Sequence, residues 1–118
     1  MAASFSQGKS RRYRGPRTNV IVDMGVNTDG NFWVTGFCRG IAISDVKCTI
    51  SGSDDKMPHA MTSSDVDAKP DPNFSQTVNR WIATFGGAPD QAGDYPVDAY
   101  NKANATDNTP KDSGVWQV

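Results

Sequence analysis

From residue 19 onward, the chain consists of short segments in which apolar and polar residues alternate, separated by turn-forming residues. A period of two places successive side chains on opposite faces of a β-strand and is typical of half-buried strands. The dipeptide Asp29-Gly30 supplies the positive φ of a tight hairpin between the first two segments. The predicted strands cover residues 19–26, 31–38, 41–50, 78–85, 95–104 and 115–118.

The second of these segments is unusual because both of its faces are apolar. One face carries Phe32, Val34, Gly36 and Cys38, and the other carries Trp33, Thr35 and Phe37. The small side chains of Gly36 and Cys38 suit a closely packed interior, so we predict that the Phe32 face packs in the core. Trp33 and Phe37 then point outward and are candidate binding residues. In the alternative, Trp33 lies in the core and Phe32 points outward, or loop residues cover the rings.

The next two stretches of the chain differ in pattern. Residues 41–50 alternate, but the inward set requires a bulge or bend near Ser44 and Asp45. That inward set is Ile43, Val46, Cys48 and Ile50. Residues 51–77 are polar and interrupted by Pro, so they are predicted to form a long loop with one short edge strand near residues 59–62.

Composition favours an all-β fold. The chain of 118 residues contains no Leu and no Glu, which are strong helix formers, and all thirteen of its acidic residues are Asp. Its apolar residues include many β-branched and aromatic types, which suit a pleated surface, while Asp and Gly favour turns. The length fits one domain with a single core. We therefore predict an antiparallel β-sandwich of six to eight strands.

The net charge of −1 hides two oppositely charged parts. Residues 1–18 are predicted to form an extended basic N-terminal arm, and residues 19–118 the sandwich domain. The arm holds five cations and no acid, so a net charge of −1 leaves −6 on the remainder. The cations are Lys9, Arg11, Arg12, Arg14 and Arg17. They are candidate contacts to an acidic protein surface; nucleic acid is the weaker candidate because the domain is acidic, and a solvated tail is the alternative.

Four segments resemble the immunoglobulin-like β-sandwich domains of bacterial and phage proteins: residues 34–36, 43–52, 81–85 and 92–106. The resemblance covers residues 19–118 and implies an immunoglobulin-like antiparallel sandwich in which Val34 points inward. It also implies that Tyr95 is the tyrosine at the sandwich corner, with its hydroxyl bonded to nearby backbone. The long loop, the basic arm and the lack of Leu depart from that pattern.

The two cysteines are predicted to be reduced thiols in the core. If residues 39–42 form the bend between antiparallel strands, Cys48 lies five residues beyond the position opposite Cys38, or about 16 Å away. A disulfide needs Cα atoms within about 7 Å, so the two thiols cannot pair. Free thiols also argue against a strongly oxidising compartment.

Catalytic and metal sites are not predicted. With two Cys and a single His, His59, the chain lacks the four ligands of a zinc site at known spacings. The Asp-rich residues 54–55 and 65–72 lack the spacing of a calcium-binding EF-hand loop. No nucleophile motif lies near His59. We therefore predict no metal, no cofactor and no enzymatic activity.

Together these features predict a non-enzymatic structural protein. The chain has no run of about 20 apolar residues that would span a membrane, and residues 1–17 have no apolar core of a secretory signal. For such a protein the resemblance implies a phage virion, reached after synthesis in the host cytoplasm. We expect a decoration protein that docks on capsid or tail subunits through the arm, Trp33 and Phe37. The alternatives are an extracellular adhesion or carbohydrate-binding module and a nucleic-acid-associated coat protein.

Overall fold

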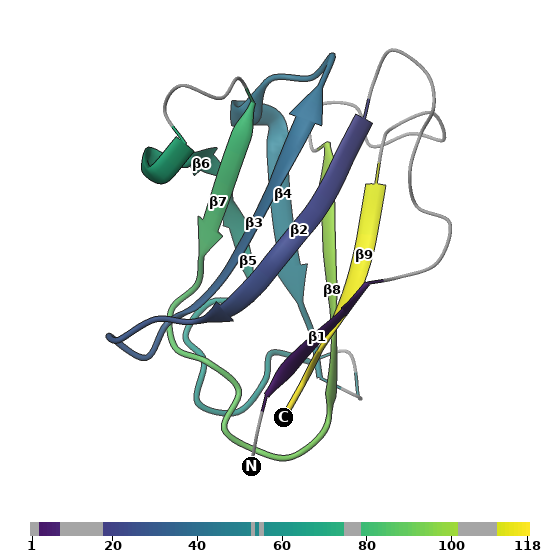
Figure 1. Ribbon diagram of the computed structural model, residues 1–118. Helices are drawn as coiled ribbons and strands as arrows, with labels where there is room; N and C mark the ends of the chain where they lie inside the picture. The colour runs from purple at the N-terminus through teal and green to yellow at the C-terminus, as the bar shows by residue number, and fades with distance from the viewer. Residues whose placement is uncertain (1–2, 8–17, 53, 55, 75–78, 102–110) are drawn as a thin grey trace.

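The protein is built from two antiparallel β-sheets packed face to face (Figure 1). The computed structural model describes residues 3–7, 18–52, 54, 56–74, 79–101 and 111–118. These residues form nine strands and two short 3₁₀ turns, and they contain no α-helix. The all-β prediction is therefore confirmed, although the strand count exceeds the expected six to eight.

The first sheet has four strands in the order β2-β3-β7-β6. The strands are β2 (Thr18–Val26), β3 (Phe32–Arg39), β7 (Arg80–Thr84) and β6 (Lys69–Pro70). The β2–β3 hairpin closes as predicted: Gly30 has a φ of 80°, and the Asn27 side chain accepts backbone N–H bonds from Asp29 and Asn31 at 3.0 Å. A shift in register between Ile21 and Asp23 marks a β-bulge in β2.

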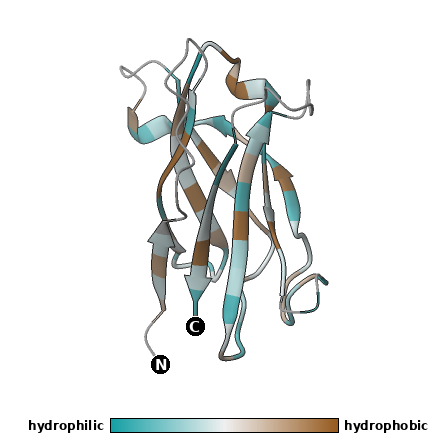
Figure 2. Cartoon of the chain, turned by 90° about the vertical axis from the view of Figure 1, so that its right-hand side faces the viewer, coloured by the Kyte–Doolittle hydropathy of each residue, from teal (hydrophilic) through white to brown (hydrophobic). Residues whose placement is uncertain are grey.

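The second sheet has five strands in the order β1-β9-β8-β4-β5. The strands are β1 (Ser4–Gln7), β9 (Lys111–Gln117), β8 (Asp94–Asn101), β4 (Val46–Ile50) and β5 (Asp65–Asp67). Figure 2 shows hydrophobic and hydrophilic residues alternating along the strands, as a two-sided sheet with one buried face requires.

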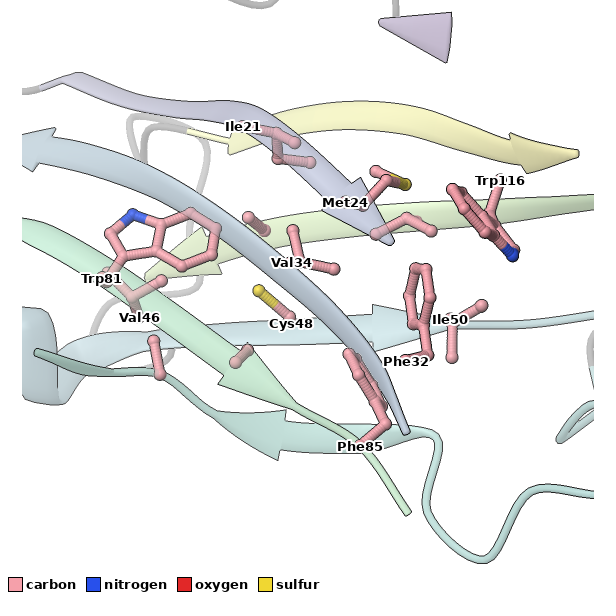
Figure 3. Packing of buried hydrophobic residues seen from close by; sticks show 14 of the residues in the cluster. Ile21, Met24, Phe32, Val34, Val46, Cys48, Ile50, Trp81, Phe85 and Trp116 are labelled. Atoms are coloured by element: carbon pink, nitrogen blue, oxygen red, sulfur yellow. The ribbon is translucent and has the colours of Figure 1, made fainter. Parts of the chain in front are cut away.

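The core fills the space between the two sheets and is dominated by aromatic rings (Figure 3). Phe32 lies between Phe85 and Trp116, with ring centroids 5.5 and 5.3 Å away. Such tilted pairs are favourable aromatic geometries. At the other end of the core, the buried Trp81 indole N–H donates to Asn19 Oδ1 at 3.0 Å. Aromatic and β-branched side chains thus supply the volume that Leu fills in most proteins.

The predicted orientation of residues 31–38 is confirmed. Phe32, Val34 and Cys38 are almost completely buried in the core. Gly36 lies directly against the Trp81 ring. A β-carbon at this position would overlap the indole and the carbonyl oxygen of Val20, so only glycine fits here. Trp33 and Phe37 alternate with these residues and therefore lie on the outer face of the four-stranded sheet.

The bend expected near Ser44 and Asp45 is a 3₁₀ turn at Ile43–Asp45. It resets the side-chain alternation before β4, and the inward residues Val46, Cys48 and Ile50 are buried as predicted. Both cysteines are buried, as predicted, and they are not joined to each other in the structure. Burial raises the pKa of the Cys38 thiol to about 11 and raises the pKa of the Cys48 thiol further.

Two segments depart from the prediction. Ser4–Gln7, which was assigned to the extended arm, forms β1 and pairs with β9, because Phe5 packs against the core. The edge strand expected near residues 59–62 is absent there: in the described chain this stretch makes one bridge, from Met61 to Gly87. The strands in the 51–77 region are instead β5 and β6, which are short and depend on pairing with β4 and β7.

The corner between the two sheets contains the hydrogen bond expected of Tyr95. Its hydroxyl donates to the backbone carbonyl of Gln91 at 2.7 Å, and the ring is 7% exposed at the start of β8. Tyr95, Val97 and Ala99 all face the core, as their alternation predicted.

Candidate docking surface

The outer face of the five-stranded sheet is polar, and its side chains bond to one another. The Gln117 amide donates to Asp94 at 3.2 Å and accepts from the hydroxyl of Ser6 at 3.2 Å. Lys47 and Asp65 form an ion pair at 2.8 Å, and their hydrogen bond raises the pKa of the lysine. This face is therefore well matched to water.

Neighbouring positions on the same face continue the polar arrangement. The hydroxyl of Ser113 donates to the Asp98 carboxylate, and the Lys111 ammonium lies 3.8 Å from the other oxygen of that carboxylate. Both partners of the lysine pair are substantially exposed, so the pair contributes little to stability. The pair and the Ser113 bond place charged and hydroxyl groups on the outer face of β8 and β9.

The outer face of the four-stranded sheet carries more apolar side chains, although the exposed Asp23 lies opposite Thr35 on it. The cross-strand register places Val20 opposite Phe37 and Thr35 opposite Ile82 on this face. Phe37 is 37% exposed, and Val22, at the β2 bulge, is 43% exposed. We call this outer face of β2, β3 and β7 the apolar face.

On the apolar face, the Trp33 ring covers a glycine of the neighbouring strand. It pairs with Gly25 on the edge strand β2, and a β-carbon on Gly25 would lie 2.7 Å from Cζ2 of the indole. The ring therefore occupies the space above the glycine, an arrangement that compensates for the missing side chain of an edge-strand glycine. Trp33 is half-buried as a result, and Phe37 is the more exposed of the two predicted binding residues.

Arg80 and Phe74 extend the apolar face beyond the residues that the sequence pointed to. Arg80 pairs with Phe37 across β3 and β7, and its guanidinium carbon lies 3.9 Å above the centre of the Phe74 ring. This is cation–π geometry. Phe74 is 40% exposed and belongs to the 3₁₀ turn Pro72–Phe74. The alternation around the buried Trp81 could have placed Arg80 outward, whereas nothing local in the sequence links Phe74 to it.

The structure does not bring all predicted site residues together. Lys9, Arg11, Arg12, Arg14 and Arg17 lie outside the described residues. Their position in the chain is between β1, on one sheet, and β2, on the other. Trp33 and Phe37 share the apolar face with Arg80.

Another polar contact, between His59 and Asp90, lies at the surface. His59 Nδ1 lies 2.8 Å from Asp90, but both side chains are more than half exposed, so this is a solvent-accessible surface pair. The described residues contain no group of three or more His, Cys, Asp or Glu that could hold a metal ion. In the same part of the chain, no helix is long and apolar enough to span a membrane.

The fold and its surface define a β-sandwich in which one outer face is polar and the other carries more apolar side chains. The chain matches no protein-family model, no curated protein and no solved structure.

Proposed function

We propose that this protein is a non-enzymatic structural protein with an immunoglobulin-like fold, which docks on the subunits of a larger assembly through its apolar face and basic arm. The assembly that fits the sequence resemblance is a phage capsid or tail, which the protein decorates. The two free, buried cysteines are compatible with synthesis in a reducing compartment.

The immunoglobulin-like part of the proposal is supported by strand order. If β2 to β9 are taken as strands A, B, C, C′, D, E, F and G, the four-stranded sheet reads A-B-E-D and the other reads G-F-C-C′. These are the sheet orders of immunoglobulin sandwiches. Tyr95 then lies at the start of strand F, with the upstream backbone bond of a tyrosine corner. β1 is an additional strand on the free edge of G.

One observation carries the docking proposal: the two outer faces of the sandwich differ in kind. A sheet face in water is ordinarily polar, as the five-stranded sheet illustrates. Phe37 and Val22 on the other sheet expose apolar area, and Arg80 is the cross-strand neighbour of Phe37. Interfaces are enriched in aromatic residues and Arg, so this combination suits contact with a protein surface. The partner would present apolar side chains and a carboxylate for Arg80.

The basic arm would add attraction over a longer range. Its five cations precede a body with six excess negative charges, so the arm is the part of the chain that suits an acidic partner. Nucleic acid remains the less favoured partner because the body would repel the phosphate backbone.

Carbohydrate binding is the second candidate, and Trp33 is the observation that favours it. An indole that lies across a glycine on the surface of a sheet resembles a platform on which a sugar ring could stack. In this case Trp33→Ala would abolish binding to a glycan array, while removal of the arm cations would have no effect. Under the docking proposal, substitution of Phe37 or removal of the arm cations reduces binding more than Trp33→Ala does.

Co-sedimentation with capsid or tail particles from the source cells tests the docking proposal. One variant carries Phe37→Ser; another replaces the five arm cations by Ser and leaves β1 intact. The control is Tyr100→Ser on the polar face of β8. We expect both test variants to lose particle association while the control keeps it. Unchanged association of both test variants would refute the docking role.

A further inference from the structure

We propose that the edge of β9 is a strand-acceptor site and that, at high local concentration, its occupant is β1 of a second copy of this chain. The two copies would exchange their β1 strands reciprocally, so that each β9 pairs with the β1 of its partner. This inference concerns self-association and does not depend on which assembly the protein decorates.

The β1 strand fits a shaped recess on β9. Gln7 pairs with Gly114, and a β-carbon on Gly114 would lie 2.8 Å from Phe5 Cε1 and 2.9 Å from the carbonyl oxygen of Ser6. The glycine therefore leaves the space into which Phe5 packs, and the Met24 methyl borders the same space at 3.4 Å. The acceptor thus combines a strand edge with an apolar recess for one aromatic side chain.

The edge occupied by β1 lacks the protection found on the other described sheet edges. Exposed edges are ordinarily blocked by charge, Pro or a bulge. β5 carries Asp65 and Asp67, and β6 consists of Lys69 and Pro70. β2 has its bulge, and its Ile21 N–H donates to the Asp112 carboxylate at 2.8 Å. The sequence of β1, Ser-Phe-Ser-Gln, contains neither charge nor Pro, so nothing in it opposes pairing with another copy.

The connection between β1 and the rest of the chain permits exchange. In the described chain β1 pairs with one strand, β9, and ten residues separate Gln7 from Thr18 in the sequence. A swapped strand makes the same contacts as an unswapped one, so the balance depends on concentration. Short tethers give effective concentrations on the order of 1 mM, so exchange becomes favourable where copies are held at that local concentration, as on an assembly.

A second copy is the fitting occupant because it carries the strand that matches the recess. Phe5 fills the space left by Gly114 whichever chain supplies β1. Reciprocal exchange closes a two-fold dimer and leaves no acceptor empty.

Disulfide trapping in the full-length chain tests the exchange. Ser6 and Val115 are directly opposite in the β1–β9 ladder, at a spacing that a disulfide can bridge. Ser6→Cys chains are mixed with Val115→Cys chains at about 1 mM and at about 10 μM, then oxidised and run on a non-reducing gel. We expect a covalent dimer at the higher concentration and at least a fivefold lower yield at the lower one. The matched control mixes Ser6→Cys with Thr49→Cys, which lies on β4 of the same sheet, and should give background dimer.

A second measurement keeps the test independent of the new cysteines. Sedimentation of the unmodified protein should give dimer at about 1 mM and monomer at about 10 μM. A monomer at both concentrations, or equal trapping with Thr49→Cys and Val115→Cys, would overturn the proposal.

Discussion

Removal of the Tyr95 hydroxyl tests whether the sandwich corner contributes to stability. In Tyr95→Phe the ring keeps its buried place, but the bond to the Gln91 carbonyl is lost. A neutral hydrogen bond contributes about 1 kcal/mol net, with a range of about 0.5–1.5. Gln91 is exposed, so water can solvate its freed carbonyl and keeps the cost within this range.

The expected loss converts to a measurable shift in melting temperature. Unfolding entropy is about 2.1 cal/mol/K per residue, which gives about 0.25 kcal/mol/K for this chain of 118 residues. A loss of about 1 kcal/mol therefore lowers Tm by about 4 °C. Tyr100 is the matched control because it lies on the same strand but on the polar outer face, and Tyr100→Phe should change stability by less than about 0.5 kcal/mol.

Urea and thermal unfolding of the three proteins give the comparison. The reasoning fails if Tyr95→Phe unfolds at the same urea concentration as the parent, or if Tyr100→Phe is equally destabilised. A changed dependence of the unfolding free energy on urea would indicate an altered denatured state instead of a lost bond.

Two further predictions concern the core. Gly36→Ala should destabilise the fold by about 3 kcal/mol or more, because the methyl overlaps the Trp81 ring and a backbone carbonyl, whereas Gly30→Ala has free space and should cost about 1–2 kcal/mol for its positive φ alone; equal losses in urea unfolding would contradict this. The buried Cys38 thiol, whose pKa is raised to about 11, should resist thiol reagents at pH 8 until the protein unfolds. Since unfolded thiols ionise near pH 8.5, the stability from the raised pKa is present below that pH and is lost as pH rises toward 11. Cys38→Ala should reduce this alkaline loss; an unchanged pH profile would argue against burial as its cause.

The strands of the sandwich interior were the predictable part of the fold. In residues 19–26, 31–38 and 95–101, the alternation of residues along the sequence predicts which side chains are buried, because one face of each strand packs in the core. The small residues Gly36 and Cys38 fixed the orientation of β3, since only the inner face is crowded. The Asp29-Gly30 turn followed from local backbone preference.

The edge strands could not be predicted, because they are held by their neighbours and carry little pattern of their own. β1 has one apolar residue, Phe5, whose site is formed by Gly114 more than 100 residues later. β5 and β6 contain three and two residues and owe their geometry to pairing with β4 and β7. The Arg80–Phe74 contact joins a strand to a 3₁₀ turn and depends on the same tertiary packing.

The central claim is that the apolar face binds a protein assembly. The most direct test is gradient sedimentation of lysate from the source cells, with the full-length chain compared with Phe37→Ser and Tyr100→Ser. We predict that the parent and Tyr100→Ser sediment with large particles and that Phe37→Ser remains at the top of the gradient. Recovery of the parent protein entirely as free monomer or dimer would contradict the claim.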